Sequence, residues 1–396
     1  MLLGIRIQNY GLFDDDCIGA LLDDIRKSPE QSSLAVKAGL DVPHPLNGIE
    51  AMIGRNHSGK TLFFSFLSFV QATVIRGPAA AATEGGRTGF SNLVGQKDKP
   101  VTATLLFKFY DPQEKDTTYC EYTLVVDANV HGKPHFEEER LRLWREGMDE
   151  PKDILYFKQG IGFVLLKGEK MEGEMNDSQT SALHAYGAMK QFYFTNRTYR
   201  EILRWFFVSF KKDKTTQNPE DMAPGGHKHL NPSGSNARNV LMYLKQENPG
   251  RYKEVISRIL EAIPALREKD EAAVMKHFNK PDMLALFILL FSDPDPRPLI
   301  LVESPDEGLY HDVLDALANE MRNYSIDFPG CQIFFTTHNP YILENLSPDE
   351  IWVFSRDEGA AGAVEVCCAG SIPIVEELYR QGVGMGAIWY AGHFDN

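Results

Sequence analysis

The 396-residue sequence lacks a long apolar run, an excess of basic residues and any cysteine spacing typical of a metal site. Its longest apolar stretch, residues 61–75, is interrupted by four polar residues and is too short and too polar to span a bilayer. The N-terminus does not show the layout of a signal peptide. We therefore expect a protein without a membrane partner.

Cysteine is scarce, and its distribution argues against a disulfide framework. The five cysteines are an odd number, and two of them are adjacent: Cys17, Cys120, Cys331, Cys367 and Cys368. Disulfide-stapled domains use even numbers of cysteines, and adjacent cysteines are poorly placed to bridge each other. This usage is typical of a reducing cytoplasm, which is the location that we expect.

Basic residues are the minority among the charged ones. Lysine and arginine number 41 against 55 aspartates and glutamates, so the net charge is −14. This charge argues against a surface that coats nucleic acid as a whole, although a local basic groove stays compatible with it. Apolar residues at 43% and charged residues at 24% exclude bulk disorder, and the length suffices for a full core.

The apolar patterns divide the chain into three parts. Residues 1–166 are β-rich, with strands predicted at 2–7, 49–53, 101–110, 119–127, 140–144 and 161–166, a helix at 61–75 and a mobile surface loop at 77–89. Residues 167–291 are mostly helical, with helices predicted at 199–210, 236–245, 251–263 and 281–291 and a polar loop at 214–235. Residues 292–396 return to strands, at 299–302, 332–336, 351–354 and 363–366, with a helix at 310–324. We predict an α/β fold in which the two outer parts form one lobe around a mixed sheet, with the helical part inserted.

One motif carries a specific chemistry. Residues 54–61 match the phosphate-loop pattern G-x-x-x-x-G-K-[ST], with a predicted strand before it and a helix after it: Gly54, Arg55, Asn56, His57, Ser58, Gly59, Lys60 and Thr61. Glycines at both ends let successive backbone N–H groups face a phosphate, and the helix adds its positive N-terminal end. Lys60 would neutralise the β- and γ-phosphates of ATP, and the Thr61 hydroxyl would hold Mg²⁺.

Two later strands end in residues that would complete such a site. Residues 299–302 form an apolar strand that ends in Glu303, a carboxylate able to hold the metal, followed by Ser304 and a turn that contains Asp306. The next strand is followed by His338, at the rim where α/β sheets bind ligands. A lone histidine is more often structural, but this order of motifs after a phosphate loop favours a role in binding the γ-phosphate.

These motifs together resemble an ABC-type P-loop ATPase head of the SMC/RecF/OLD group, and most of all the stand-alone bacterial ATPases of anti-phage defence operons. The likeness covers nearly the whole chain, from IRIQNYGLF through IGRNHSGKT, LILVESPDEG and FFTTHNPYIL to the closing WYAGHF. It implies that ATP is held between two heads, so that the protein pairs with itself. It also implies a signature segment in trans, which aligns with Asn279, and a metal-sensing glutamine, for which Gln191 is the candidate.

The chain departs from the group at two places. The metal-binding acid is usually followed by a glutamate that orients the attacking water, whereas Ser304 stands here and cannot act as a carboxylate base. The signature glycine is missing, since Asn279 and Lys280 precede Pro281, although Asn279 could cap the following helix. Asp306 would then be a substitute base, and we expect slow ATP hydrolysis.

The sequence thus predicts an ATP- and Mg²⁺-binding head that dimerises and gates a separately encoded effector, such as a nuclease or toxin, in anti-phage defence. Two alternatives stay open: a RecF-like ATPase that clamps DNA, and a scaffold that binds ATP with little turnover. A basic stripe at Arg197, Arg200 and Arg204 would serve DNA phosphates in the first alternative, although a solvated helix face explains it as well.

Overall fold

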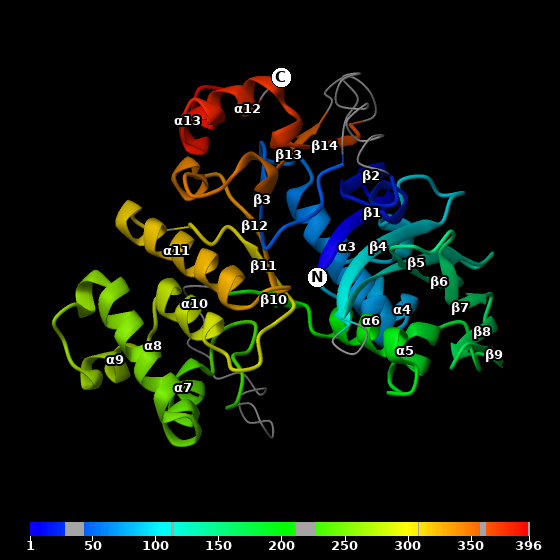
Figure 1. Ribbon diagram of the computed structural model, residues 1–396, viewed down its shortest axis with the longest axis horizontal. Helices are drawn as coiled ribbons and strands as arrows, with labels where there is room; N and C mark the ends of the chain where they lie inside the picture. Colours follow the sequence, from blue (N-terminus) through cyan, green and yellow to red (C-terminus); the bar gives the residue numbers. More distant parts are fainter. Residues whose placement is uncertain (28–42, 112–114, 211–226, 308, 357–361, 395–396) are drawn as a thin grey trace.

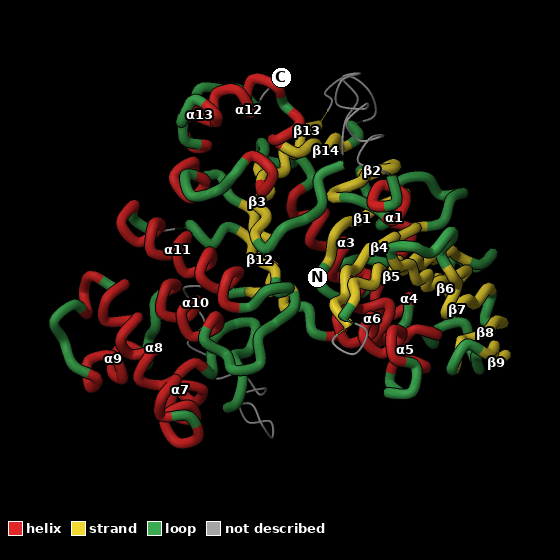
Figure 2. Tube along the Cα trace, viewed as in Figure 1, coloured by secondary structure: helices red, strands yellow, loops and turns green. Residues whose placement is uncertain are grey.

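The computed structural model describes residues 1–27, 43–111, 115–210, 227–307, 309–356 and 362–394, and it is built around two β-sheets. Figure 1 shows the larger sheet on one side of the smaller one and the helices α7–α10 on the other side. Figure 2 shows the same division, with strands gathered on one flank and helices on the opposite flank. The described segments contain no helix long and apolar enough to cross a membrane.

The larger sheet is antiparallel throughout and has the strand order β2-β1-β4-β5-β6-β7-β8-β9. Its strands are β1 (Leu2–Tyr10), β2 (Phe13–Gly19), β4 (Val101–Asp111), β5 (Asp116–Ala128), β6 (Pro134–Arg145), β7 (Lys152–Lys158), β8 (Ile161–Leu166) and β9 (Glu169–Glu174). Alternating buried and part-exposed residues along β5 and β6 match the period of two that a half-buried strand requires. The strands predicted in this region are confirmed, and β2, β7 and β9 are additional.

The smaller sheet is mainly parallel and has the order β10-β11-β12-β3-β13-β14. Its strands are β10 (Phe206–Val208), β11 (Leu299–Glu303), β12 (Gln332–Thr336), β3 (Ile49–Ile53), β13 (Ile351–Arg356) and the antiparallel edge strand β14 (Val364–Cys368). Strands from both outer parts of the chain therefore share one sheet, as the α/β prediction requires. All five residues of β3 are buried, which is the pattern of a parallel strand covered on both faces.

The two faces of this sheet belong to two different cores. On one face, side chains pack with helix α3 (Lys60–Arg76) and the larger sheet, among them Met52, Leu301, Phe334 and Trp352. On the other face, alternate residues pack with the helices of the middle of the chain, among them Ala51, Ile300, Phe335 and Val353. Helix α3 thus lies between the two sheets, which explains why it carries apolar residues on several sides.

The remaining helices surround this framework. They are α1 (Leu22–Ile25), α4 (Pro78–Ala81), α5 (Ala182–Gly187), α6 (Tyr193–Leu203), α7 (Ala237–Glu247), α8 (Pro249–Ala262), α9 (Glu271–His277), α10 (Met283–Phe291), α11 (His311–Asp327), α12 (Pro373–Arg380) and α13 (Met385–Tyr390). Helices α7, α8, α10 and α11 match the predicted ones to within a few residues. The polar loop predicted at 214–235 lies partly outside the described residues.

Two expectations about local structure are wrong. The helix predicted at 199–210 ends at Leu203, and Phe206–Val208 instead form β10, which pairs in parallel with β11. The loop predicted at 77–89 contains α4, and the side chain of Arg87 is buried there, where its guanidinium donates to the Ala81 carbonyl at 2.6 Å. In both cases tertiary packing overrides the local pattern.

Candidate nucleotide-binding site

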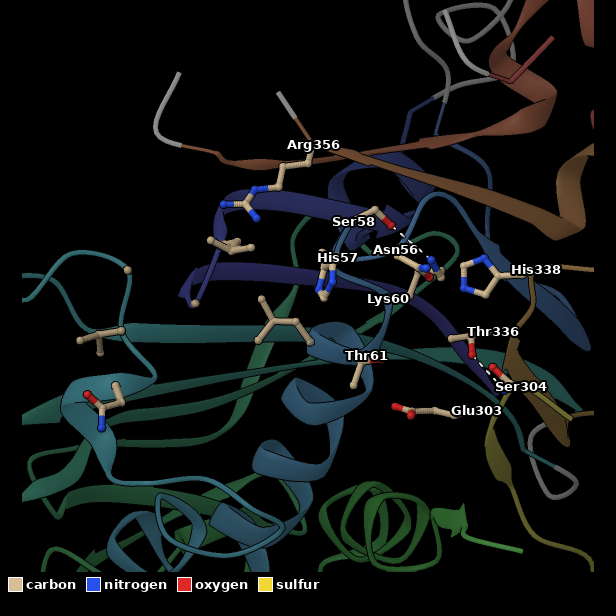
Figure 3. Close-up of a pocket in the computed structure, with 17 residues that line it drawn as sticks. Asn56, His57, Ser58, Lys60, Thr61, Glu303, Ser304, Thr336, His338 and Arg356 are labelled. Atoms are coloured by element: carbon tan, nitrogen blue, oxygen red, sulfur yellow. Dashed lines mark hydrogen bonds between the residues drawn. The ribbon is translucent and has the colours of Figure 1, made fainter. Parts of the chain in front are cut away.

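The site lies where three neighbouring parallel strands end. Strands β3, β11 and β12 are adjacent and run the same way, so the segments that follow them meet at one edge of the sheet. The phosphate loop follows β3, Ser304 follows β11 and His338 lies just beyond β12. Figure 3 shows these side chains converging on one cavity. Ligands of α/β proteins bind at this edge of the sheet.

The loop can adopt its fold only because its two glycines lack side chains. Gly54 and Gly59 have φ angles of 138° and 107°. A Cβ on Gly54 would lie 2.1 Å from the Phe354 carbonyl oxygen, and one on Gly59 would lie 2.7 Å from Val364 Cγ2. His57 also has a positive φ of 64°, a conformation that non-glycine residues rarely adopt. His57 therefore holds, under strain, a backbone conformation that glycine adopts more easily.

Lys60 is the first residue of α3 and is buried within the loop. Its ammonium donates hydrogen bonds to the carbonyl oxygens of Gly54 at 2.7 Å and Arg55 at 2.8 Å. Burial lowers the pKa of Lys60 to about 8. A desolvated cation that holds only neutral acceptors is well suited to exchange them for anionic oxygens, which bind it more strongly.

A cavity of about 630 Å³ opens beside the loop, a size suited to a nucleotide-sized ligand. It is lined by Asn56, His57, Ser58, Gly59, Lys60, Thr61, Glu303, Ser304, Thr336 and His338, and also by Gly11, Leu12, Leu62, Asn92, Val94, Gly95 and Arg356. The first group consists mainly of the residues that the sequence predicted. The structure therefore brings together six residues of the phosphate loop with Glu303, Ser304 and His338.

Thr61 and Glu303 are the candidate metal ligands, and both side chains are exposed where they line this cavity. A hydroxyl and a carboxylate are the hard oxygen donors that Mg²⁺ prefers, and Mg²⁺ usually binds one or two protein ligands together with phosphates and waters. The donor set therefore fits Mg²⁺ bound with a nucleotide. Glu303 lies opposite Thr336 in the β11–β12 register, which fixes its position at the edge of the sheet.

Ser304 occupies the place of the usual catalytic glutamate and is held in an unusual conformation. Its φ is 45°, in the left-handed region. Its N–H donates to both the carbonyl oxygen and the hydroxyl of Thr336, each at 3.1 Å, as Figure 3 shows for the hydroxyl. These hydrogen bonds hold the backbone after β11 against β12. Ser304 brings a hydroxyl to the cavity and no carboxylate.

Asp306 lies deeper than a residue of an exposed turn, close to His338. Its Oδ1 is buried and, among the described residues, has no hydrogen-bond partner. Burial raises the pKa of Asp306, against the lowering effects of a Thr337 hydrogen bond and of His338. Burial and the neighbouring Lys60 lower the pKa of His338, while Asp306 opposes this shift. A carboxyl with raised proton affinity next to a neutral imidazole is a suitable arrangement for moving a proton.

Five predicted residues are not among those that line this cavity: Gly54, Arg55, Asp306, Gln191 and Asn279. Gln191 is exposed and precedes Phe192, the N-cap of α6, so the structure does not place the metal-sensing glutamine in the cavity. Asn279 does not cap α10, because that helix starts at Met283 and the Asp282 carboxylate accepts the Ala285 N–H at 2.8 Å. Asn279 instead accepts a hydrogen bond from Arg238 at 2.7 Å. Its role toward a second head stays a prediction.

Other residues enter the site without a sequence signal. Ser209 follows β10 at the same edge of the sheet, where a second cavity of about 750 Å³ is also lined by Glu303 and Ser304. If residues 206–208 had been predicted as a strand, Ser209, the polar residue that follows it, would have been expected at this edge of the sheet. Arg356 ends β13 and also lines the first cavity. Nothing in its local sequence distinguishes it from a surface arginine.

In the basic stripe of Arg197, Arg200 and Arg204, two of the three side chains make contacts within the chain. Arg197 donates to the Tyr110 carbonyl at 2.9 Å and lies over the ring of Phe109. Arg204 forms an ion pair with Asp295 at 2.5 Å. Arg200 is exposed, whereas Lys211, Lys212 and Lys214, which continue the stripe in the sequence, lie outside the described residues. These contacts favour a structural role for Arg197 and Arg204 over binding to DNA.

Comparison with known proteins gives one family match and several structural likenesses. Residues 282–344, from the start of α10 through β11 and β12 to His338 and beyond, match the family described as "AAA domain, putative AbiEii toxin, Type IV TA system". No curated protein matches the sequence.

Three solved structures that resemble this chain are SMC head domains. One, bound to the C-terminal winged-helix domain of ScpA, is 12% identical, with 93% of this chain and 98% of that chain covered and a TM-score of 0.45. The head of Thermotoga maritima is 11% identical, with 93% and 98% covered and a TM-score of 0.39. That of Pyrococcus furiosus, bound to the C-terminal domain of ScpA, is 10% identical, with 96% and 99% covered and a TM-score of 0.42.

The fold assignment rests on the molecule itself, since these TM-scores are below 0.5. The phosphate loop follows β3, the candidate metal-binding carboxylate ends β11, and the histidine follows β12, all at one edge of a largely parallel sheet. The family match covers the second and third of these segments. The observed mixed α/β fold agrees with the predicted fold class, and the family match is to an AAA domain, which is the ATPase kind that the sequence predicted.

Proposed function

We propose that the chain is an ABC-type head that binds ATP with Mg²⁺, pairs with a second head and so gates a partner effector. The convergence of Lys60, Thr61, Glu303 and His338 on one cavity of about 630 Å³ carries the proposal. Each of these residues comes from a segment that the sequence singled out independently. Their arrangement offers a cation, two metal ligands and an imidazole around the place of a triphosphate.

Different residues of the chain would bind the phosphates and the Mg²⁺ ion. Backbone N–H groups of the loop and the N-terminus of α3 would hold the β-phosphate, and Lys60 would exchange its carbonyl acceptors for phosphate oxygens. Thr61 and Glu303 would hold Mg²⁺, which when bound neutralises phosphate charge. His338, kept neutral by its surroundings, would hydrogen-bond the γ-phosphate.

Pairing of two heads would involve the segment around Asn279 and the turn at Pro305–Glu307. Since the Asp282 carboxylate already caps α10, the helix end itself offers little to an anion. Lys280, which is exposed, and Asn279 would therefore supply the contacts to a partner's γ-phosphate. Glu307, at the end of the turn, is also exposed.

The effector is proposed from the family match alone. The description of the matched family names a toxin and a type IV toxin–antitoxin system. We infer that ATP binding by this chain controls a separately encoded nuclease or toxin in anti-phage defence. A second candidate, an ATP-dependent scaffold with little turnover, is favoured by the absence of a carboxylate at Ser304.

The experiment that tests the binding site is calorimetry with ATP and Mg²⁺. Lys60→Ala removes the charge-assisted contacts to phosphate, so ATP affinity should fall roughly 100-fold, since each such contact contributes about 1.5–3 kcal/mol. Lys269→Ala, at an exposed lysine far along the chain, is the matched control and should bind as the wild type does. Unchanged ATP affinity in a folded Lys60→Ala protein would remove the phosphate-loop assignment.

A further inference from the structure

A second group of chemically active side chains lies away from the nucleotide cavity. His44 precedes β3, Asp349 lies in the 3₁₀ turn Pro348–Glu350 that leads into β13, and Cys368 ends β14. The strands β13, β3 and β14 are neighbours, and Trp352 pairs with Cys368. The group therefore sits where β3 and β13 begin, at the opposite edge of the sheet from the phosphate loop.

The three ligand atoms are close to one another. One imidazole nitrogen, one carboxylate oxygen and the thiol sulfur all lie within 4.8 Å of each other. His44 Nδ1 and Asp349 Oδ1 are 2.9 Å apart. In a tetrahedral zinc site with bonds of about 2.0–2.3 Å, ligand atoms are separated by roughly 3.3–3.6 Å. The side chains would thus need to shift by only about 1 Å to share one ion.

The surroundings keep the ligands in place. Cys368 is 3% exposed, and its thiol donates to the Pro348 carbonyl at 3.7 Å, next to Asp349 in the chain. A Cβ on Gly370 would lie 2.2 Å from Asp349 Oδ1 and 3.3 Å from His44 Cε1. The glycine at this position is what allows the carboxylate and the imidazole to approach each other there.

The local charge favours a cation. Glu50 is fully buried, and both it and Asp349 act electrostatically on the Cys368 thiol. The nearby Glu350 is neutralised by Arg322, which donates to both of its oxygens at 2.5 and 2.8 Å. Glu50 instead accepts hydrogen bonds from the Asn47 N–H and from Trp352 Nε1, which are neutral donors. Burial raises the pKa of Glu50 well above its usual value, so the negative charge offered to a cation here comes from the Asp349 carboxylate beside His44.

We propose that His44, Asp349 and Cys368 bind a zinc ion. Imidazole, carboxylate and thiolate are the three ligand types of protein zinc sites, and the presence of a thiolate disfavours Mg²⁺ and Ca²⁺. A water would take the fourth position. The ion would tie the segment before β3 to the start of β13 and the end of β14, and so brace the strand that presents the phosphate loop.

Cobalt titration of the untagged full-length protein tests this site. After chelation and desalting, one equivalent of Co²⁺ should produce thiolate-to-cobalt charge-transfer absorption and the visible bands of a tetrahedral ion, and Zn²⁺ should displace it. Cys368→Ser should abolish the charge-transfer band. Cys367→Ser is the matched control, because the adjacent residue on a strand points to the opposite face, and it should leave the spectrum unchanged.

Two further measurements complete the test. His44→Ala should weaken Zn²⁺ binding more than about 100-fold, since even outer partners of zinc ligands typically contribute about 10–100-fold. Zn²⁺ should raise the melting temperature of the wild type but not of His44→Ala, which also decides the matter if Cys368→Ser fails to fold. An unchanged cobalt spectrum in Cys368→Ser, or equal Zn²⁺ affinity in the wild type and His44→Ala, would overturn the proposal.

Discussion

His57 shows at the level of one residue how the phosphate loop differs from a fully relaxed one. Its φ of 64° is a left-handed conformation that costs a residue with a side chain about 1–2 kcal/mol relative to glycine. Its flanking residues Asn56 and Ser58 do not have positive φ angles. Within residues 56–58 the strain is thus confined to His57.

We therefore expect His57→Gly to raise the free energy of unfolding by about 1 kcal/mol and to leave ATP binding intact. Asn56→Gly is the control and should lower stability, because glycine there only adds conformational freedom to the unfolded chain. Chemical denaturation of the three proteins measures both effects. A lower denaturation midpoint in His57→Gly would show that the imidazole makes contacts that outweigh the strain.

Ser304 and Asp306 decide the hydrolysis chemistry. A hydroxyl can position a water but cannot accept its proton at neutral pH, and general-base assistance contributes about 10²–10⁴-fold. We expect slow phosphate release from the wild type and a rate higher by about 100-fold in Ser304→Glu. Steady-state phosphate release from the wild type, Ser304→Glu and Asp306→Ala measures this.

The Asp306→Ala variant tests whether the Asp306 carboxyl acts as the general base. Asp306 has a raised pKa and lies close enough to His338 for their charges to interact. A brisk wild-type rate that collapses in Asp306→Ala would show that the base has moved from the end of β11 into the turn. In that case the expectation of slow turnover is wrong, and the carboxyl of Asp306 does the work of the missing glutamate.

Gln332 joins elements of the two sheets. This residue begins β12 in the smaller sheet and is 1% exposed. Its side-chain amide accepts the Leu2 N–H at 2.7 Å and donates to the carbonyl oxygens of Leu2 at 2.9 Å and Asn47 at 2.8 Å. The start of β1, the segment before β3 and β12 are therefore held together by one side chain.

Gln332→Leu should destabilise the protein by about 3 kcal/mol, because it removes the partner of two buried groups of Leu2 and of the partly buried Asn47 carbonyl, and each buried group left without a partner costs about 1–3 kcal/mol. Gln8→Leu, at a partly exposed glutamine of β1, is the control and should change stability by less than about 1 kcal/mol. Thermal or urea unfolding measures the difference. Equal stability of the two variants would show that the amide is not what links the sheets.

For the whole molecule, a split site predicts that nucleotide drives self-association. Light scattering should show one head without nucleotide and at least two with saturating ATP and Mg²⁺. Lys60→Ala should stay monomeric under both conditions, since it lacks the ligand that joins the heads. A wild-type protein that stays monomeric with ATP bound would refute the pairing and the roles of Asn279 and Lys280.

Much of the fold and of the phosphate site follows from the sequence by itself. The phosphate loop is contiguous, so its glycines, Lys60 and Thr61 are placed by local geometry alone. Strands β3, β11 and β12 are continuous apolar runs, and the shared direction of parallel strands brings Glu303 and His338 to the same edge. A sequence pattern can predict the position of a residue when its contacts are close in sequence or repeat along a strand.

The remaining features were decided by tertiary structure. The sequence pattern predicts the three residues of β10 as the end of a helix. They form a strand because they pair with β11, and this pairing brings Ser209 to the site. Asp282 rather than Asn279 caps α10, a choice between two adequate caps that the packing of the helix makes. Arg356 reaches the cavity from β13, and His44 meets Cys368 across the sheet. Such contacts join residues far apart in the chain, and no local propensity encodes them.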